Sequence, residues 1–180
     1  YEAGINVTSL PGACACITAL TMSGQPTRRF AFEAFLPYDK KERAQILENL
    51  RNETRTIIIY EAPHHLKKTL KECREYLGNR NMTVCKELTK RYEQKRKSTL
   101  DEMIAYYEEN EPRGEYVLIF EGKSLQELKE EKQQEWNQFT VQEHMEHYLE
   151  KGMDKKSAMK QVAKDRGVSK RNIYQELLKK

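Results

Sequence analysis

Short apolar runs alternate with amphipathic segments along the chain, and this alternation predicts an α/β fold. Residues 56–60 and 116–120 are apolar at nearly every position, which is typical of central strands that are covered on both faces. Residues 40–52 instead place apolar side chains at helical spacing, with charged residues between them. We therefore expect a buried central sheet of about five strands flanked by helices, followed by a small all-helical tail.

Turn-forming residues divide the chain into the expected elements. Pro11-Gly12 ends the first strand, and Pro37 ends the second. Thr99 precedes Asp101, a pattern that favours a helix start because a helix N-terminus attracts negative charge. In chain order we expect a strand at 5–10, a helix at 13–22, a strand at 29–36, a helix at 40–52, a strand at 56–60, a helix at 66–77, a strand at 82–88, an extended edge at 89–99, a helix at 100–109 and a strand at 116–120.

The charge is distributed unevenly. The chain carries a formal net charge of +4, and residues 151–180 alone contain ten Lys or Arg and three Asp or Glu. Such a basic segment favours an anionic partner such as nucleic acid, although a solvated helical face has the same composition. We divide the chain into an α/β domain at 1–122, a charged linker at 123–139 and a basic helical tail at 140–180.

The tail carries a helix-turn-helix pattern. Apolar residues at helical spacing precede Gly167-Val168-Ser169, and a second apolar series begins at Ile173. Ser169 is placed to cap the second helix, on which Lys170 and Arg171 would face outward. A helical hairpin that docks on the sheet or on a partner subunit has the same pattern. The tail therefore predicts either a nucleic-acid contact or a docking element.

Four cysteines without a secretory signal pattern indicate reduced thiols in a cytoplasmic protein. Cys14 and Cys16 form a C-x-C pair, but a metal site needs two more ligands, and His64-His65 is the only nearby candidate. We expect no metal and interpret these cysteines as small buried apolar residues. No stretch approaches the ~18 apolar residues of a membrane span, so we expect no membrane partner.

Several short stretches place chemically useful groups at strand ends. Residues 9–13 form either a plain turn or a helix entry whose free N–H groups hold a carboxylate or phosphate. Tyr60 and Glu61 end the most apolar strand. Ligands of open α/β sheets bind beyond the carboxyl ends of strands. Glu61 also fits the alternative of an exposed loop carboxylate. Residues 86–90 alternate in charge, which is equally typical of a solvated ion-pair stretch.

Together, five stretches resemble the motifs of one protein family. They are Ser-Leu-Pro-Gly-Ala-Cys-Ala at 9–15, Phe-Glu-Ala-Phe-Leu-Pro at 32–37, Tyr-Glu-Ala-Pro-His-His at 60–65, Lys-Glu-Leu-Thr-Lys at 86–90 followed by Glu93, and Gly-Glu-Tyr-Val-Leu at 114–118. In order and approximate spacing they resemble the ribosomal RNA small subunit methyltransferase I family, a branch of the tetrapyrrole methylases. The resemblance covers residues 1 to about 122. Ala34 stands where the family has glycine, Ala62 where it has serine, and His65 and Lys86 where it has arginine.

The resemblance implies the C-terminal domain of the tetrapyrrole-methylase fold, with a mixed sheet and S-adenosyl-L-methionine as cofactor. It also implies methylation of a cytidine ribose 2′-hydroxyl in 16S rRNA, so the expected partners are 16S rRNA or the small ribosomal subunit and a second copy in a homodimer. The residues implied to line the cofactor are Gly12, Ala13, Cys14, Ala15, Tyr60, Glu61, Leu88, Gly114, Glu115 and Tyr116. The polar candidates for catalysis are Glu61, Glu87 and Lys90, and the choice of general base among them stays open.

The family's N-terminal domain, which also faces the cofactor, is absent from the sequence. We therefore expect an excised fragment that is inactive alone. Two other functions stay open, namely a methylase acting on a corrin or porphyrin precursor and a nucleic-acid-binding module without catalysis. The stretches at 60–64 and 87–90 and the basic tail favour the RNA-directed branch.

Overall fold

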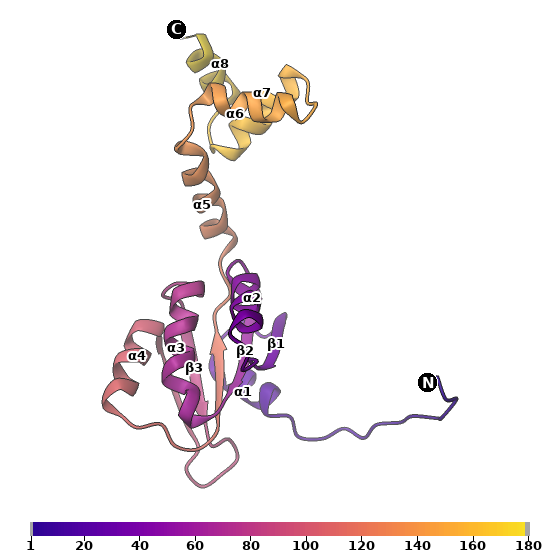
Figure 1. Cartoon of the computed structure of the whole chain (residues 1–180), viewed down its shortest axis with the longest axis vertical. Coiled ribbons are helices and arrows are strands. Elements are labelled where there is room, and N and C mark those ends of the chain that lie inside the picture. Colours follow the sequence, from indigo (N-terminus) through magenta and orange to yellow (C-terminus); the bar gives the residue numbers. More distant parts are fainter. Residues whose placement is uncertain (1, 179–180) are drawn as a thin grey trace. The chain divides into compact units, whose positions relative to one another are not determined.

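The computed structural model describes residues 2–178, which form two compact units divided between Lys123 and Ser124. Figure 1 shows the elements of both units. The first unit alternates helices and strands, as the sequence predicts. Its elements are α1 (Ala15–Ser23), β1 (Phe30–Phe35), α2 (Lys40–Leu50), β2 (Thr56–Glu61), α3 (Pro63–Leu77), β3 (Asn81–Lys86), β4 (Gln94–Thr99), α4 (Leu100–Glu109) and β5 (Tyr116–Phe120).

The five strands form one mixed sheet in the order β1-β2-β5-β3-β4. β1 and β2 are parallel, whereas β5 runs antiparallel to both β2 and β3, and β4 runs antiparallel to β3. The carboxyl ends of β1, β2 and β3 therefore meet the amino ends of β4 and β5 at one edge of the sheet. We call this the site edge, and it is marked by Phe35, Glu61, Lys86, Gln94 and Tyr116.

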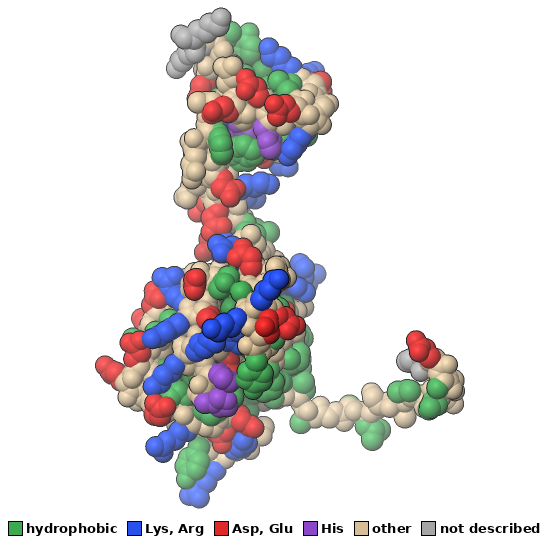
Figure 2. Space-filling model, viewed as in Figure 1, with side chains coloured by type: hydrophobic (Ala, Val, Ile, Leu, Met, Phe, Trp, Pro, Cys, Tyr) green, Lys and Arg blue, Asp and Glu red, His purple; other side chains and the backbone are tan. Residues whose placement is uncertain are grey.

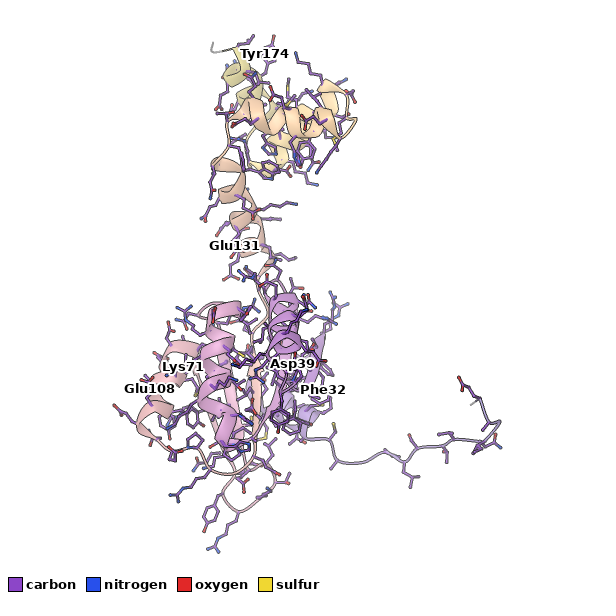
Figure 3. The ribbon with its side chains drawn as sticks, viewed as in Figure 1. Phe32, Asp39, Lys71, Glu108, Glu131 and Tyr174 are labelled. Carbon is purple, nitrogen blue, oxygen red and sulfur yellow. The ribbon has the colours of Figure 1, made fainter. Side chains whose placement is uncertain are left out.

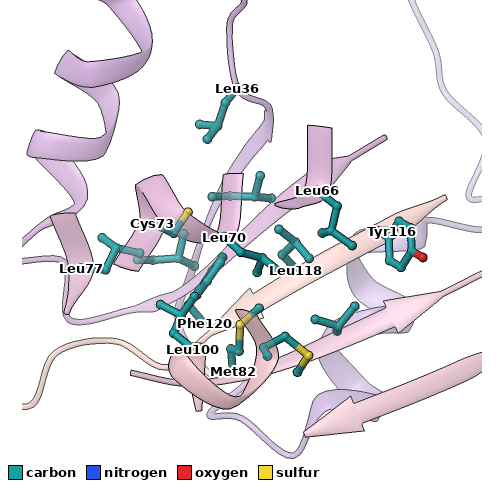
Figure 4. Packing of buried hydrophobic residues seen from close by; sticks show 14 of the residues in the cluster. Leu36, Leu66, Leu70, Cys73, Leu77, Met82, Leu100, Tyr116, Leu118 and Phe120 are labelled. Atoms are coloured by element: carbon teal, nitrogen blue, oxygen red, sulfur yellow. The ribbon is translucent and has the colours of Figure 1, made fainter. Parts of the chain in front are cut away.

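Both faces of the sheet are buried, which confirms the prediction made from the apolar strands. Ile57 and Ile59 face a large cluster with side chains of α2, α3 and α4, whereas Ile58 faces a smaller cluster with α1. Figure 4 shows how Leu66 and Leu70 of α3 pack over the strands in the larger cluster. β2 and β5 are neighbours, and Ile58 pairs directly with Ile119. We call the two sides of the sheet the α4 face and the α1 face.

Helix boundaries follow local chemistry. Thr99 and Glu102 form the reciprocal cap that starts α4, where the sequence predicts a helix start. α3 begins three residues before its predicted start, because Pro63 lies in the first helical turn, where its missing N–H has no cost. The extended edge expected at 89–99 is strand only over β4, because residues 87–93 form turns.

The strand expected at 5–10 is wrong. No strand is assigned there, and Ile5, Val7 and Leu10 are 67%, 66% and 89% exposed. An apolar run becomes a strand only when a neighbouring strand satisfies its backbone, and none of the described strands pairs with this segment. The strand expected at 29–36 does form as β1, but its register with β2 shifts between Phe32 and Phe35.

The described part of the second unit is all helical, as expected for residues 140–180, and it also includes most of the segment that we predicted as a linker. It consists of α5 (Leu125–Asn137), α6 (Val141–Glu150), α7 (Lys155–Asp165) and α8 (Lys170–Leu178). Its core contains Met145, Val162 and Ile173, among other apolar residues. Gly167 has φ 65° in the turn between α7 and α8, and the Ser169 hydroxyl accepts a hydrogen bond from the Asn172 N–H at 3.2 Å. The capping role predicted for Ser169 is confirmed.

Candidate functional site

The strand register brings three of the predicted stretches together at the site edge. Tyr116 pairs with Glu61 on one side and with Lys86 on the other. Beyond the last pair, the Glu87 N–H donates to the Glu115 carbonyl at 3.0 Å. Residues that are 55 and 30 residues apart in the chain are thus neighbours in space.

Glu87 and Lys90 are joined through the turn before β5. The Glu87 carboxylate accepts a hydrogen bond from the Glu115 N–H at 2.9 Å. The Lys90 ammonium lies 3.2 Å from the Glu87 carboxylate and 2.8 Å from that of Glu115. The Glu115 N–H and Lys90 together hold the pKa of Glu87 below its usual value, and the two carboxylates raise the pKa of Lys90. Glu87 is therefore ionised and Lys90 protonated at neutral pH.

Gly114 is required in this turn. Its φ is 83°, which side-chain-bearing residues rarely adopt, and a Cβ there would lie 2.5 Å from the Glu87 carboxylate oxygen. Glu87 and Thr89 also have positive φ, 52° and 64°. Leu88, which lies between them, packs partly buried against the cluster of the α1 face. The unusual backbone thus carries Leu88 to the α1 face, where Tyr60 also packs.

The start of α1 lies on the same face. Tyr60 packs against the cluster that contains Cys16 of α1, and α1 contacts β5, β3 and β2. The Cys14 side chain does not cap α1, so the first N–H groups of the helix have no capping side chain among the described residues. Gly12 and Ala13, which precede it, are exposed.

The two cysteines at this helix start differ. Cys16 is buried as expected, but Cys14 is exposed, so the prediction that both are buried is wrong for Cys14. Cys14 is the N-cap and lies outside the first helical turn, whereas Cys16 faces the sheet. Their sulfur atoms are 3.3 Å apart, and this hydrogen bond lowers the pKa of Cys14.

Glu61 points to the opposite face and is only 5% exposed, so its interpretation as an exposed loop carboxylate is wrong. It accepts hydrogen bonds from the Thr69 hydroxyl and, at 2.8 Å, from the Ala62 N–H. The Arg43 guanidinium lies 3.8 Å from Glu61 and also donates to Thr69 and Glu72, each at 2.6 Å. This buried network ties the end of β2 to α2 and α3.

The structure therefore brings together Glu87 and Lys90 but not Glu61. β5 lies between β2 and β3, so Glu61 stands two strand spacings, about 9–10 Å, from the strand that leads to Glu87. Glu61 instead lines a small hollow of about 100 Å³ with Arg43 of α2, His65 of α3 and residues 35–38. Sequence reasoning missed Arg43, although it lies four residues before Leu47 on the apolar side of α2, where a charged residue needs a partner.

Residues 1–104 match the family model of the Tetrapyrrole (Corrin/Porphyrin) Methylases. The chain belongs to this tetrapyrrole methylase family. It is 46% identical over 171 residues to the "Ribosomal RNA small subunit methyltransferase I" of Halalkalibacterium halodurans, which covers 95% of the chain and 58% of the relative. The protein of the same name from Bacillus subtilis is 45% identical, over 96% of the chain and 59% of the relative. The one from Escherichia coli O157:H7 is 43% identical over 129 residues, or 70% and 45% of the two chains.

These comparisons confirm the resemblance and the fold inferred from the five motifs. The chain spans about three fifths of the length of the curated tetrapyrrole methylases that match it over nearly its whole length. Among residues 2–178, no group of three or more His, Cys, Asp or Glu side chains is arranged to hold a metal ion. No helix in the same range is long and apolar enough to cross a membrane.

Proposed function

We propose that this chain is part of an S-adenosyl-L-methionine-dependent methyltransferase that acts on small-subunit ribosomal RNA, at the ribose 2′-hydroxyl of a cytidine. The observation that carries the proposal is the meeting of Tyr60, Leu88 and the start of α1 on one face of the sheet. These residues come from three separate motifs of the family. The names of the relatives from Halalkalibacterium halodurans and Bacillus subtilis support an RNA substrate.

The α1 face suits this cofactor chemically. The adenosyl group of the cofactor needs an apolar wall, which Tyr60 and Leu88 would provide. The carboxylate of its methionine part needs hydrogen-bond donors, which the uncapped N–H groups of α1 would provide. Gly12, Ala13, Cys14 and Ala15 would contribute through their backbone, as would the turn formed by Gly114 and Glu115. Glu61 and Tyr116 would offer only main-chain atoms, because their side chains pack on the α4 face.

When bound, S-adenosyl-L-methionine supplies a methyl group on a positively charged sulfur. The protein's task is to hold the ribose hydroxyl in line and to remove its proton. Positioning alone supplies up to about 7–11 kcal/mol of the barrier, and a general base adds about 10²–10⁴-fold.

We assign Glu87, Lys90 and Glu61 supporting roles in this task. Glu87 holds the turn of Gly114 and Glu115 against β3, and Lys90 presents a cation beside it. Glu61 fixes the end of β2, and hence Tyr60, through its bonds to Thr69 and Arg43. In this proposal all three residues position other groups, and none is assigned the transfer of the proton.

The test is methyl transfer by the product of the complete reading frame that encodes this chain. Tritiated S-adenosyl-L-methionine would be supplied with small ribosomal subunits, with 16S rRNA and with a corrin precursor. We expect label in the RNA and 2′-O-methylcytidine in its nucleoside digest. Label only in the corrin precursor would refute the RNA substrate, and a methylated base in place of ribose would refute the 2′-hydroxyl.

The partners are part of the same proposal. A ribosomal substrate places the protein in the cytoplasm, and we expect it to act as a homodimer, which sedimentation of the complete product would test. The basic tail would add an RNA contact through Lys170 and Arg171, which are exposed at the start of α8.

A further inference from the structure

A second polar surface lies beside the outer strand β4. A hollow of about 600 Å³ there is lined in part by Lys86, Gln94, Arg96, Tyr106 and Tyr107. An adjoining hollow of about 310 Å³ shares all of these except Arg96 and extends to Arg113. We call the two together the β4 groove.

The β4 groove lies on the α4 face, away from the proposed cofactor wall. Arg96 pairs directly with Val84 in the sheet, and Val84 belongs to the cluster beneath α3 and α4. Directly paired residues of neighbouring strands point to the same face. The groove nevertheless reaches the site edge, because Lys86 and Gln94 are the last residue pair of β3 and β4.

The cations of the groove lack acidic partners. Within residues 2–178, no carboxylate lies within 4.0 Å of Lys86, Arg96 or Arg113. Glu111, the one carboxylate among the described residues that line the groove, is paired with Lys67 at 2.8 Å. The groove therefore keeps an uncompensated positive charge.

The neighbouring helices show the opposite pattern. Lys71 of α3 lies 3.0 Å from Glu108 of α4, and both are labelled in Figure 3. Arg74 likewise pairs with Asp101. Figure 2 shows blue and red side chains intermixed on the first unit in this view. The charged side chains of α3 and α4 thus pair with each other, whereas those of the groove do not.

Aromatic rings form the floor of the groove. The Arg96 guanidinium lies 3.8 Å from the centre of the Tyr106 ring, and Tyr106 and Tyr107 contact edge to face at 5.0 Å. Stacking holds the planar guanidinium in place and leaves its N–H groups for an anion. Charged residues on an edge strand also prevent sheet-to-sheet pairing, but that role needs no aromatic floor.

We propose that the β4 groove binds the sugar-phosphate backbone of the RNA substrate; this inference rests on the function proposed above. Arg96 and Lys86 would contact phosphates, the Gln94 amide would contact a ribose hydroxyl, and the Tyr106 edge would contact a base. An acidic protein segment would satisfy the cations alone. The groove combines cations, an amide and aromatic rings, which matches RNA more completely.

The test compares two double variants of the complete product. Lys86→Gln with Arg96→Gln removes two groove charges, whereas Lys40→Gln with Lys41→Gln removes two exposed charges from α2, which does not line the groove. Binding to 16S rRNA would be measured at several salt concentrations, and S-adenosyl-L-methionine binding and thermal unfolding would be measured in parallel. Polyglutamate would serve as the acidic-protein probe.

We expect the groove variant to flatten the slope of log K against log[salt] for RNA by about 0.7–0.9 per lost contact. The α2 variant should keep the wild-type slope, and both should bind the cofactor like the wild type. An unchanged RNA slope in the groove variant, or weakened binding of polyglutamate alone, would overturn the groove while leaving the proposed function intact. Failure of the wild type to bind RNA would overturn both.

Discussion

The imidazole ring of His144 lies face to face with the indole ring of Trp136, with their centres 3.6 Å apart and their planes inclined by 6°. His144 is fully buried, and its Nδ1 accepts a hydrogen bond from Arg166 at 3.2 Å. Its Nε2 lies 3.5 Å from the Asp165 carboxylate and has no hydrogen-bond partner among residues 2–178. Burial, followed by the charge of Arg166, lowers the pKa of His144 to about 4. The helical unit is therefore built around a neutral histidine.

We predict that acid destabilises this helical unit. The unfolded chain binds a proton at His144 near pH 6.5 and the folded chain does so only near pH 4, so stability falls as the pH drops from about 6.5 to 4. The expected loss is roughly 1–3 kcal/mol. Trp136 is the only tryptophan, so its fluorescence during urea unfolding reports this unit. His144→Phe should remove much of the pH dependence, and an unchanged dependence in that variant would contradict the role of His144.

We predict that Ala34→Gly stabilises the α/β unit. Ala34 has φ 51° where the register of β1 shifts, and this conformation costs a side-chain-bearing residue about 1–2 kcal/mol. Glycine loses about 0.5–1 kcal/mol more conformational entropy on folding, so the expected net gain is up to about 1 kcal/mol. Ala31→Gly, in the same strand at a buried position, is the control and should destabilise. Equal losses in the two variants, measured by urea unfolding, would be incompatible with strain at Ala34.

We predict that Cys14 alkylates before the other cysteines. Cys14 is exposed and has a lowered pKa, whereas burial raises the pKa of Cys73 to about 12 and that of Cys85 to about 11. Because the thiolate is the reactive form, iodoacetamide should label Cys14 first, as peptide mass spectrometry would show. S-adenosyl-L-methionine should slow this labelling in the complete product. Labelling at the same rate with and without cofactor would place Cys14 outside the cofactor site.

We predict that the tail contributes to RNA binding. Replacing Lys170 and Arg171 with Ala in the complete product should weaken binding to the small subunit and flatten its salt dependence by about 0.7–0.9 per lost contact. Both residues occupy the first turn of α8, where the helix dipole disfavours cations, so a purely structural role does not explain them. Lys40→Ala with Lys41→Ala is the charge-matched control. If affinity and slope stay at wild-type values, the tail is a docking element.

The sequence predicted the strands and helix starts that depend on residues close together in the chain. The β-branched runs of β2 and β5 predicted central strands, and Thr99 and Ser169 predicted helix starts, because each pattern acts within a few residues. The segment at 5–10 also carries spaced apolar residues, but none of the described strands pairs with it, and pairing is not a local property. The prediction failed there for that reason.

For the candidate site, the sequence predicted which residues lie at strand ends but not the face of the sheet to which their side chains point. The strand pattern placed Glu61 and Glu87 at strand ends, and in the structure Glu61 ends β2 and Glu87 directly follows β3. Whether Glu61 pointed to α1 or to α3 depended on its contacts with Arg43 and Thr69. Arg43 lies on the apolar side of α2, but the sequence did not show which carboxylate it would meet. The positive φ angles of Glu87 and Thr89, which direct Leu88 to the α1 face, left no pattern in the sequence.

Calorimetric titration of S-adenosyl-L-methionine into the complete product, comparing Leu88→Ala with Leu125→Ala, tests the α1 face most directly. Leu88 packs partly buried beside Tyr60, whereas Leu125 is 69% exposed on α5. Loss of an apolar contact worth about 1–2 kcal/mol should raise the dissociation constant of Leu88→Ala about 5- to 30-fold. Leu125→Ala should bind like the wild type. Wild-type affinity in Leu88→Ala would contradict the placement of the cofactor on the α1 face.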